Sequence, residues 1–127
     1  MAFRFCNPNP NKEVVGDCVI RAISILLDRD WDDVYAKISL QGFKMKDMPS
    51  SNAVWSEYLK EQGFEPQLVA CQFSKPPCTV RSFAELHPFG RFLLFIGGHV
   101  VTVVNGDYYD TWDSGDEVPS IYWKERH

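Results

Sequence analysis

The sequence predicts a single α+β domain over residues 1–127, in which helices come first and strands last. Three patterns support this prediction. A nearly continuous apolar stretch begins at Cys18, aromatic and aliphatic residues dominate from Arg91 onward, and Asn105-Gly106 is a strong signal for a two-residue hairpin. We therefore expect the helix that begins at Cys18 to pack against a C-terminal antiparallel sheet formed from about residue 91.

The helices are predicted from apolar periodicity and from residues that favour helix ends. The first covers Cys18 to about Leu27 and is interrupted only by Arg21 and Ser24, so it belongs in the middle of the domain. Asp17 is a good N-cap for this helix. Further helices are expected at 30–42, at 51–63 and at 82–87, the last capped by Ser82.

The expected strands are short and lie mostly after the helices. The prolines at positions 8 and 10 keep residues 7–12 out of regular structure. Strands are expected at 67–71, 91–96, 99–104, 107–112 and 120–123.

The composition is that of a chain with one hydrophobic core. Of 127 residues, 45% are hydrophobic and 14% are aromatic, which excludes a disordered chain. The net charge of −4 disfavours a nucleic-acid partner held through its phosphates. No apolar run approaches the roughly 20 residues of a membrane span, and the first six residues lack the apolar core of a signal peptide. We therefore expect a cytoplasmic protein with no nucleic-acid or membrane partner.

Four cysteines are present: Cys6, Cys18, Cys71 and Cys78. In a cytoplasmic chain they are expected to be free thiols. The spacing of Cys71 and Cys78 does not fit the usual zinc-binding patterns. The acidic segment 113–117 lacks the twelve-residue ligand pattern of a calcium loop. The sequence therefore predicts neither a metal site nor another cofactor.

Cys18 has a favourable position for a reactive thiol. Gly16 permits a tight turn and Asp17 caps the helix, so Cys18 falls in the first helical turn. There the positive end of the helix dipole and the free backbone N–H groups favour the thiolate over the thiol. A lone cysteine is more often a buried apolar thiol, so the interpretation of Cys18 as a nucleophile depends on a partner base.

His99 is the better of two internal candidates for that base. It follows Gly97-Gly98 and opens a strand, whereas His87 precedes Pro88 at a helix end, a position typical of the surface.

The hairpin register selects the group that would orient His99. A two-residue turn pairs Val104 with Asp107 and puts Asp110 on the same strand face as His99. A three-residue turn would shift the register by one and bring Asp113 to His99 instead. The Asn-Gly pair favours the two-residue turn, so Asp110 is the expected partner and Asp113 the alternative.

These segments resemble a minimal papain-like cysteine peptidase. The order Cys18, His99 and then Asp110 matches that family, and Asp110-Thr111-Trp112 is similar to its Asn-Ser-Trp segment. The chain also resembles small proteins of phages and gut bacteria that share the Gly-Asp-Cys-Val-Ile-Arg-Ala and Asp-Thr-Trp-Asp-Ser-Gly-Asp segments. The resemblance implies a papain-like fold and a thiol-dependent hydrolase, a peptidase or amidase that acts on a peptide, isopeptide or protein.

The resemblance also implies a role for each residue. Cys18 would be the nucleophile, His99 the base, Asp110 the group that orients His99, and Trp112 the cover that shields them from water. Papain-like enzymes have a glutamine six residues before the cysteine, which helps to bind the oxyanion, but this sequence has Lys12 there. Besides the backbone N–H of Cys18, three asparagines of the preceding loop are candidates for that function: Asn7, Asn9 and Asn11.

Other interpretations remain open at this stage. The same residues would support a transglutaminase-like acyl transfer to an amine, and a degenerate peptidase fold could instead be a non-catalytic protein-interaction module. Arg21 also has two interpretations, because it either pairs with an acid near the site or lies on the surface.

Overall fold

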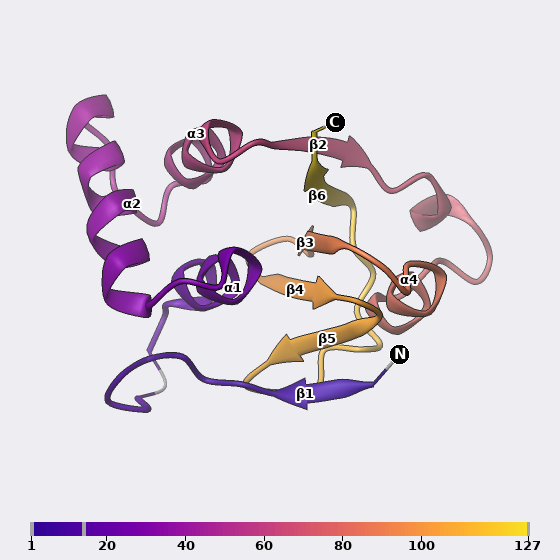
Figure 1. The fold of residues 1–127 in the computed structure, drawn as a ribbon. Coiled ribbons are helices and arrows are strands. Elements are labelled where there is room, and N and C mark those ends of the chain that lie inside the picture. Colours follow the sequence, from indigo (N-terminus) through magenta and orange to yellow (C-terminus); the bar gives the residue numbers. More distant parts are fainter. Residues whose placement is uncertain (1, 14, 127) are drawn as a thin grey trace.

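Within the described residues, 2–13 and 15–126, the computed structural model contains six strands that form one mixed sheet (Figure 1). The strands are β1 (Phe3–Phe5), β2 (Phe64–Leu68), β3 (Arg91–Phe95), β4 (Val100–Val104), β5 (Asp107–Asp110) and β6 (Ile121–Glu125). They lie in the order β1-β5-β4-β3-β6-β2. β1 runs parallel to β5, and the other neighbouring strands are antiparallel.

The α+β class predicted from the sequence is confirmed, but the sheet is neither purely antiparallel nor purely C-terminal. β1 joins one edge from the start of the chain, and β2 forms the opposite edge from its middle. β1 has only three residues, too few for a recognisable alternation, and its backbone becomes a strand by pairing with β5. Pro66 in β2 is tolerated because an edge strand leaves one row of its N–H groups unpaired.

Helices cover both faces of the sheet. One face carries α1 (Cys18–Leu27), α2 (Trp31–Met45) and α3 (Asn52–Glu61), and the other carries α4 (Val80–Leu86). A short 3₁₀ helix, η1 (Ala70–Phe73), follows β2.

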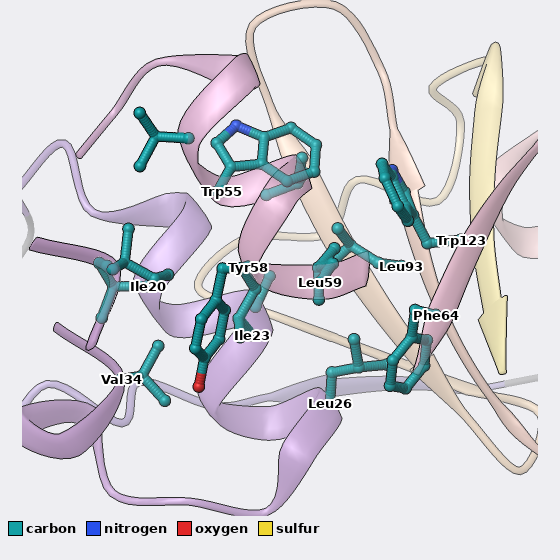
Figure 2. Packing of buried hydrophobic residues seen from close by; sticks show 14 residues of the cluster. Ile20, Ile23, Leu26, Val34, Trp55, Tyr58, Leu59, Phe64, Leu93 and Trp123 are labelled. Carbon is teal, nitrogen blue, oxygen red and sulfur yellow. The ribbon is translucent and has the colours of Figure 1, made fainter. Parts of the chain in front are cut away.

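The larger hydrophobic core lies between α1 and the sheet and is closed by α2 and α3 (Figure 2). Ile23 and Leu26 of α1 are completely buried there. Burial of one such side chain stabilises the fold by about 1.5–3 kcal/mol. Other buried members of this core are Ile20, Val34, Trp55, Tyr58, Leu59, Phe64, Leu93 and Trp123.

β4 contributes to both faces and fixes the position of α1. Val101 and Val103 pack in the smaller core under α4, whereas Val100 packs in the larger core with α1. Thr102 is fully buried, and its hydroxyl donates a hydrogen bond to the carbonyl oxygen of Ala22 in α1. This bond sets the position of α1 along the strand that follows His99.

Two tight turns define the β3–β4–β5 meander. Val104 pairs with Asp107, as the predicted Asn-Gly turn requires. Gly97-Gly98 forms a second two-residue turn, and both glycines have positive φ angles (73° and 79°). Two consecutive residues with positive φ are typical of the hairpin turn that suits twisted strands. Across this turn the N–H of Ile96 donates to the carbonyl oxygen of His99 (2.9 Å).

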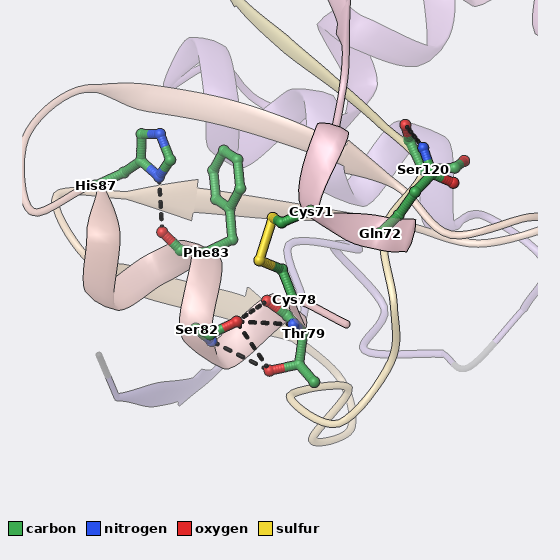
Figure 3. The surroundings of a disulfide bond; sticks show 8 residues. All are labelled: Cys71, Gln72, Cys78, Thr79, Ser82, Phe83, His87 and Ser120. Atoms are coloured by element: carbon green, nitrogen blue, oxygen red, sulfur yellow. Dashed lines mark hydrogen bonds between the residues drawn. A yellow bond between two sulfur atoms is a disulfide. The ribbon is translucent and has the colours of Figure 1, made fainter. Parts of the chain in front are cut away.

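Two predicted helix ends are wrong. α2 does not end near Gly42 but continues to Met45. Gly42 lies inside the helix, where the chain that follows the helix packs closely against it. The N–H of Asp47 donates to the carbonyl oxygen of Gly42 (2.9 Å). α4 is capped by Thr79 and not by Ser82, since Thr79 and Ser82 form a reciprocal capping box (Figure 3).

The prediction of four free thiols is also wrong. Cys71 and Cys78 form a disulfide that links η1 to the segment before α4 (Figure 3), and Cys6 and Cys18 are free. The chain folds back between the two cysteines, so their Cα atoms lie 5.4 Å apart, within the usual range for a disulfide. Structural disulfides are more usual in oxidising compartments than in the cytosol, and the cytoplasmic location stays a prediction.

A search of the described residues found no helix both long and apolar enough to cross a membrane.

Replacement of Gly42 by alanine is expected to destabilise the fold. A Cβ atom at this position would lie 2.7 Å from the backbone oxygen of Asp47. In a helix interior, alanine ordinarily gains about 1 kcal/mol over glycine, but overpacking against backbone costs about 1–3 kcal/mol. We expect Gly42→Ala to lower the free energy of unfolding in urea denaturation. Gly16→Ala is the control, because no heavy atom of the described chain beyond its neighbours lies within 4 Å of that Cβ position; an equal effect of both variants would contradict this explanation.

Candidate active site

Cys18 lies at the first residue of α1 and lines a cavity of about 530 Å³. His99 lines the same cavity, directly before β4 and directly after the Gly97-Gly98 turn. Most of the other lining residues are apolar: Val15, Val19, Ile20, Trp31, Tyr35, Pro49, Phe95 and Val100. The structure therefore brings the candidate nucleophile and the candidate base together at one cleft.

His99 stands between Cys18 and Asp110. Its Nε2–H donates a hydrogen bond to Oδ2 of Asp110 (2.7 Å). The ring also interacts with the Cys18 side chain, since this interaction contributes to the pKa shifts of both residues, and Nδ1 is the ring nitrogen left for it. The three groups thus form a continuous chain from thiol to imidazole to carboxylate.

The surroundings favour a charged form of this pair. Burial raises the pKa of Cys18, but hydrogen bonds from His99 and from the backbone N–H of Val100 outweigh it, so the pKa is lowered overall. Burial lowers the pKa of His99, but its hydrogen bonds to Asp110 and Cys18 outweigh this effect and raise the pKa to about 9. These opposite shifts favour a thiolate–imidazolium pair at neutral pH.

Asp110 is the last residue of β5 and is almost fully buried. Apart from His99, it accepts hydrogen bonds from the hydroxyl of Ser114 (3.1 Å) and from the backbone N–H of Thr111 (2.8 Å). Nη2 of Arg21 lies 4.0 Å from its Oδ1 atom. These contacts hold the carboxylate in one orientation toward His99.

The alternative partner, Asp113, does not face His99. Its carboxylate accepts hydrogen bonds from the hydroxyl of Tyr108 (2.6 Å) and from the backbone N–H of Gly115 (2.9 Å). The two-residue turn at Asn105-Gly106 decides between the two acids, because it sets the register that brings Asp110 to His99.

The other histidine candidate and the candidate cover are also placed by the structure. Nδ1–H of His87 donates to the carbonyl oxygen of Phe83 (2.8 Å), and the His87 ring stacks on the Phe83 ring (Figure 3). The ring of Trp112 lies beside His99, with 5.0 Å between the ring centroids, and is 44% exposed. Trp112 therefore shields one side of His99 from water.

The three candidate asparagines do not lie at the cleft. The amide of Asn7 donates to the carbonyl oxygen of Glu13 (3.3 Å), and the amide of Asn9 donates to Asp17 (3.4 Å). The side-chain oxygens of Asn7 and Asn9 accept backbone N–H groups two residues later, at Asn9 and Asn11, and Asn11 is exposed. None of the three is among the described residues that line the cavity. They fold the loop before α1 and are not positioned to bind an oxyanion.

Two other donors are available in the cleft. Cys18 is the first residue of α1, so its backbone N–H has no acceptor within the helix. Asn52, at the start of α3, also lines the cavity. Nε1–H of Trp55 donates to Oδ1 of Asn52 (3.0 Å), which leaves the Asn52 NH₂ group as a donor. Nothing in the sequence pattern singles out Asn52, because only the packing of α3 brings it to the cleft.

A second cavity of about 300 Å³ adjoins the first, and Asn52 and Phe95 line both. Its other lining residues come from α3 and from the β2 and β6 edge of the sheet: Trp55, Ser56, Lys60, Pro66, Ile121 and Trp123. The two cavities therefore share a wall that is formed by Asn52 and Phe95.

The described residues contain no group of three or more His, Cys, Asp or Glu side chains arranged to hold a metal ion. In the acidic segment considered for calcium, Asp113 is bound to Tyr108 and Asp116 pairs with Arg81 (2.5 Å). The disulfide withdraws Cys71 and Cys78 from metal binding.

Comparison of the chain with protein-family models, with curated proteins and with solved structures found no match. The functional interpretation therefore depends on the geometry of the site.

Cys18 is expected to react as a thiolate below the pH at which an ordinary thiol does. The lowered pKa of Cys18 predicts that iodoacetamide labelling persists as the pH falls below about 8.5, the value of a free thiol. His99→Ala removes the hydrogen bond that lowers this pKa but leaves the burial that raises it, so the labelling midpoint should move to higher pH. Mass spectrometry separates Cys18 from Cys6, whose pKa is raised by burial. An unchanged midpoint in His99→Ala would contradict the assigned contact.

Proposed function

We propose that this protein is a thiol-dependent hydrolase, a peptidase or amidase, with Cys18 as nucleophile, His99 as acid and base, and Asp110 as the group that orients His99. One observation supports the proposal most: His99 bridges the Cys18 thiol and the buried Asp110 carboxylate, to which it is bonded at 2.7 Å. A nucleophile, its base and an orienting group in contact are the arrangement that acyl transfer requires. The resemblance of these segments to papain-like peptidases agrees with it.

The reaction follows from the charges of the pair. The Cys18 thiolate attacks the carbonyl carbon of an amide, and the C=O electrons move onto oxygen to give a tetrahedral oxyanion. The oxyanion collapses, the C–N bond breaks, and the His99 imidazolium gives its proton to the leaving amine. Water then attacks the thioester while His99 takes its proton, and the thiolate leaves.

The oxyanion would be bound by the N–H of Cys18, with the Asn52 amide as a candidate second donor. This assignment replaces the three loop asparagines, because none of them lines the cavity and the amides of Asn7 and Asn9 bind Glu13 and Asp17.

The shape of the site favours an extended acyl substrate. The main cavity, about 530 Å³, has mostly apolar walls beside Cys18, and the second cavity shares Asn52 and Phe95 with it. A peptide or protein segment can occupy both cavities, with apolar side chains against the walls and its scissile carbonyl at Cys18.

The test of the proposal is turnover of a library of fluorogenic peptide amides. Cys18→Ala is expected to abolish turnover and covalent labelling by a peptide aldehyde, because both need the thiolate. Asp110→Ala should lower kcat/KM about 100-fold, since a misoriented base costs about that much.

Asp113→Ala is the matched control, because it removes a nearby acid that contacts Tyr108 and not His99. Its turnover should match that of the unaltered protein. If the purified protein neither turns over any member of the library nor reacts with the aldehyde at Cys18, the hydrolase proposal is wrong and the non-catalytic interaction module is favoured. Product formation only in the presence of an added amine would identify the transferase instead.

A further inference from the structure

Arg21 is a buried cation one helical turn after Cys18 on α1, and the proposed reaction does not yet give it a role. Only 7% of its surface is exposed. Nη1 donates to Oδ1 of Asp17 and to the carbonyl oxygen of Val15 (3.3 Å), and Nη2 lies 4.0 Å from Oδ1 of Asp110. The guanidinium therefore bridges two buried carboxylates, one before α1 and one at the end of β5.

Asp17 is a firm anchor for this bridge. Its Oδ2 atom accepts a hydrogen bond from Nε1–H of Trp31 (2.9 Å) and one from the amide of Asn9 (3.4 Å). Although Asp17 occupies the N-cap position of α1, its side chain makes no capping hydrogen bond. The carboxylate is instead directed to Arg21, which fixes one end of the guanidinium.

The charges of the network alternate in sign from the loop before α1 to the thiol. When the proton of the Cys18 thiol lies on His99, the five groups Asp17, Arg21, Asp110, His99 and Cys18 follow one another as anion, cation, anion, cation and anion. Each buried carboxylate thus has a cation beside it, which offsets the cost of removing it from water.

We propose that Arg21 is a positioning residue that holds the Asp110 carboxylate against Nε2 of His99, and so acts on the Cys18–His99 pair without touching substrate. This inference rests on the proposed function of Cys18 and His99. Asp110 has His99 on its Oδ2 side and Arg21 on its Oδ1 side, so loss of Arg21 removes the cation from the Oδ1 side and leaves the Thr111 N–H as the contact there. A lysine would keep the charge but not the planar fork that reaches two carboxylates at once.

The experiment compares Arg21→Gln and Arg21→Lys with the unaltered protein. In Arg21→Gln the labelling rate of Cys18 at about pH 6 should fall about tenfold, as for a pKa rise of about one unit. The labelling rate of Arg21→Lys should lie between those of Arg21→Gln and the unaltered protein, because lysine keeps the charge but not the geometry. The ring N–H proton of His99 is observed in parallel by NMR, where its hydrogen bond to Asp110 should give a downfield signal that weakens in Arg21→Gln.

Arg91→Gln is the matched control. Arg91 donates to the carbonyl oxygen of Leu26 (2.8 Å) and pairs with Glu125, so it anchors the opposite end of α1 without contacting the site. This variant is expected to lose stability but to keep the labelling profile and the His99 signal. A role for Arg21 in stability alone would lower the melting temperature of its variants and leave both readouts unchanged, and that result would overturn the inference.

The outcomes also separate this inference from the proposed function. An ordinary thiol profile in the unaltered protein overturns the hydrolase proposal, whereas the effect of Arg21→Gln on the His99 signal still decides whether Arg21 positions Asp110. If Arg21→Gln does not fold, Asp17→Asn tests the same bridge from its other end, with a smaller shift of the labelling profile in the same direction. No shift in a folded Asp17→Asn or Arg21→Lys variant would contradict the inference.

Discussion

The packing of α1 on β4 is the contact on which the site depends. α1 is apolar almost all round, so it is stable only when other elements cover it, and here β4 covers one side while α2 and α3 cover the rest. The buried hydrogen bond from Thr102 to the Ala22 carbonyl fixes how far α1 lies along β4. A slip along the strand would leave the Thr102 hydroxyl without its partner in the core, which is costly. Because Cys18 begins α1 and His99 directly precedes β4, the same contact sets the position of Cys18 relative to His99.

The chemistry of the site comes from charge pairs held in an apolar setting. The cavity beside Cys18 has mostly apolar walls, and the groups behind it are almost fully buried. Electrostatic interactions are stronger in such an environment than in water, so His99 lowers the pKa of Cys18 although burial alone would raise it. A cysteine at a helix start is a weak signal by itself, and the neighbouring cation makes it a nucleophile candidate.

The polar groups of the loop before α1 bind one another and Asp17 instead of lining the cleft. The asparagines of this loop are used as hydrogen-bonding groups that fold the loop itself, and Asn9 also supports Asp17. Lys12, at the position of the expected glutamine, donates to the carbonyl oxygen of Asn7 (2.9 Å). The loop thus supports Asp17, the partner of Arg21, and the two candidate donors that belong to the cleft lie on α1 and α3.

The sequence by itself determined the α+β class and the start of α1 at Cys18, and it favoured Asp110 over Asp113 as the partner of His99. These features depend on local chemistry: apolar periodicity, turn residues and the period of two along a strand. Only the tertiary structure decided the mixed sheet, the Cys71–Cys78 disulfide, the loss of the loop asparagines as oxyanion candidates, and the place of Asn52 and Arg21. Each of these features either brings together segments that are far apart in sequence or depends on which of several partners a polar group binds. Such choices are made by packing, because a buried polar group must find a partner wherever the fold supplies one.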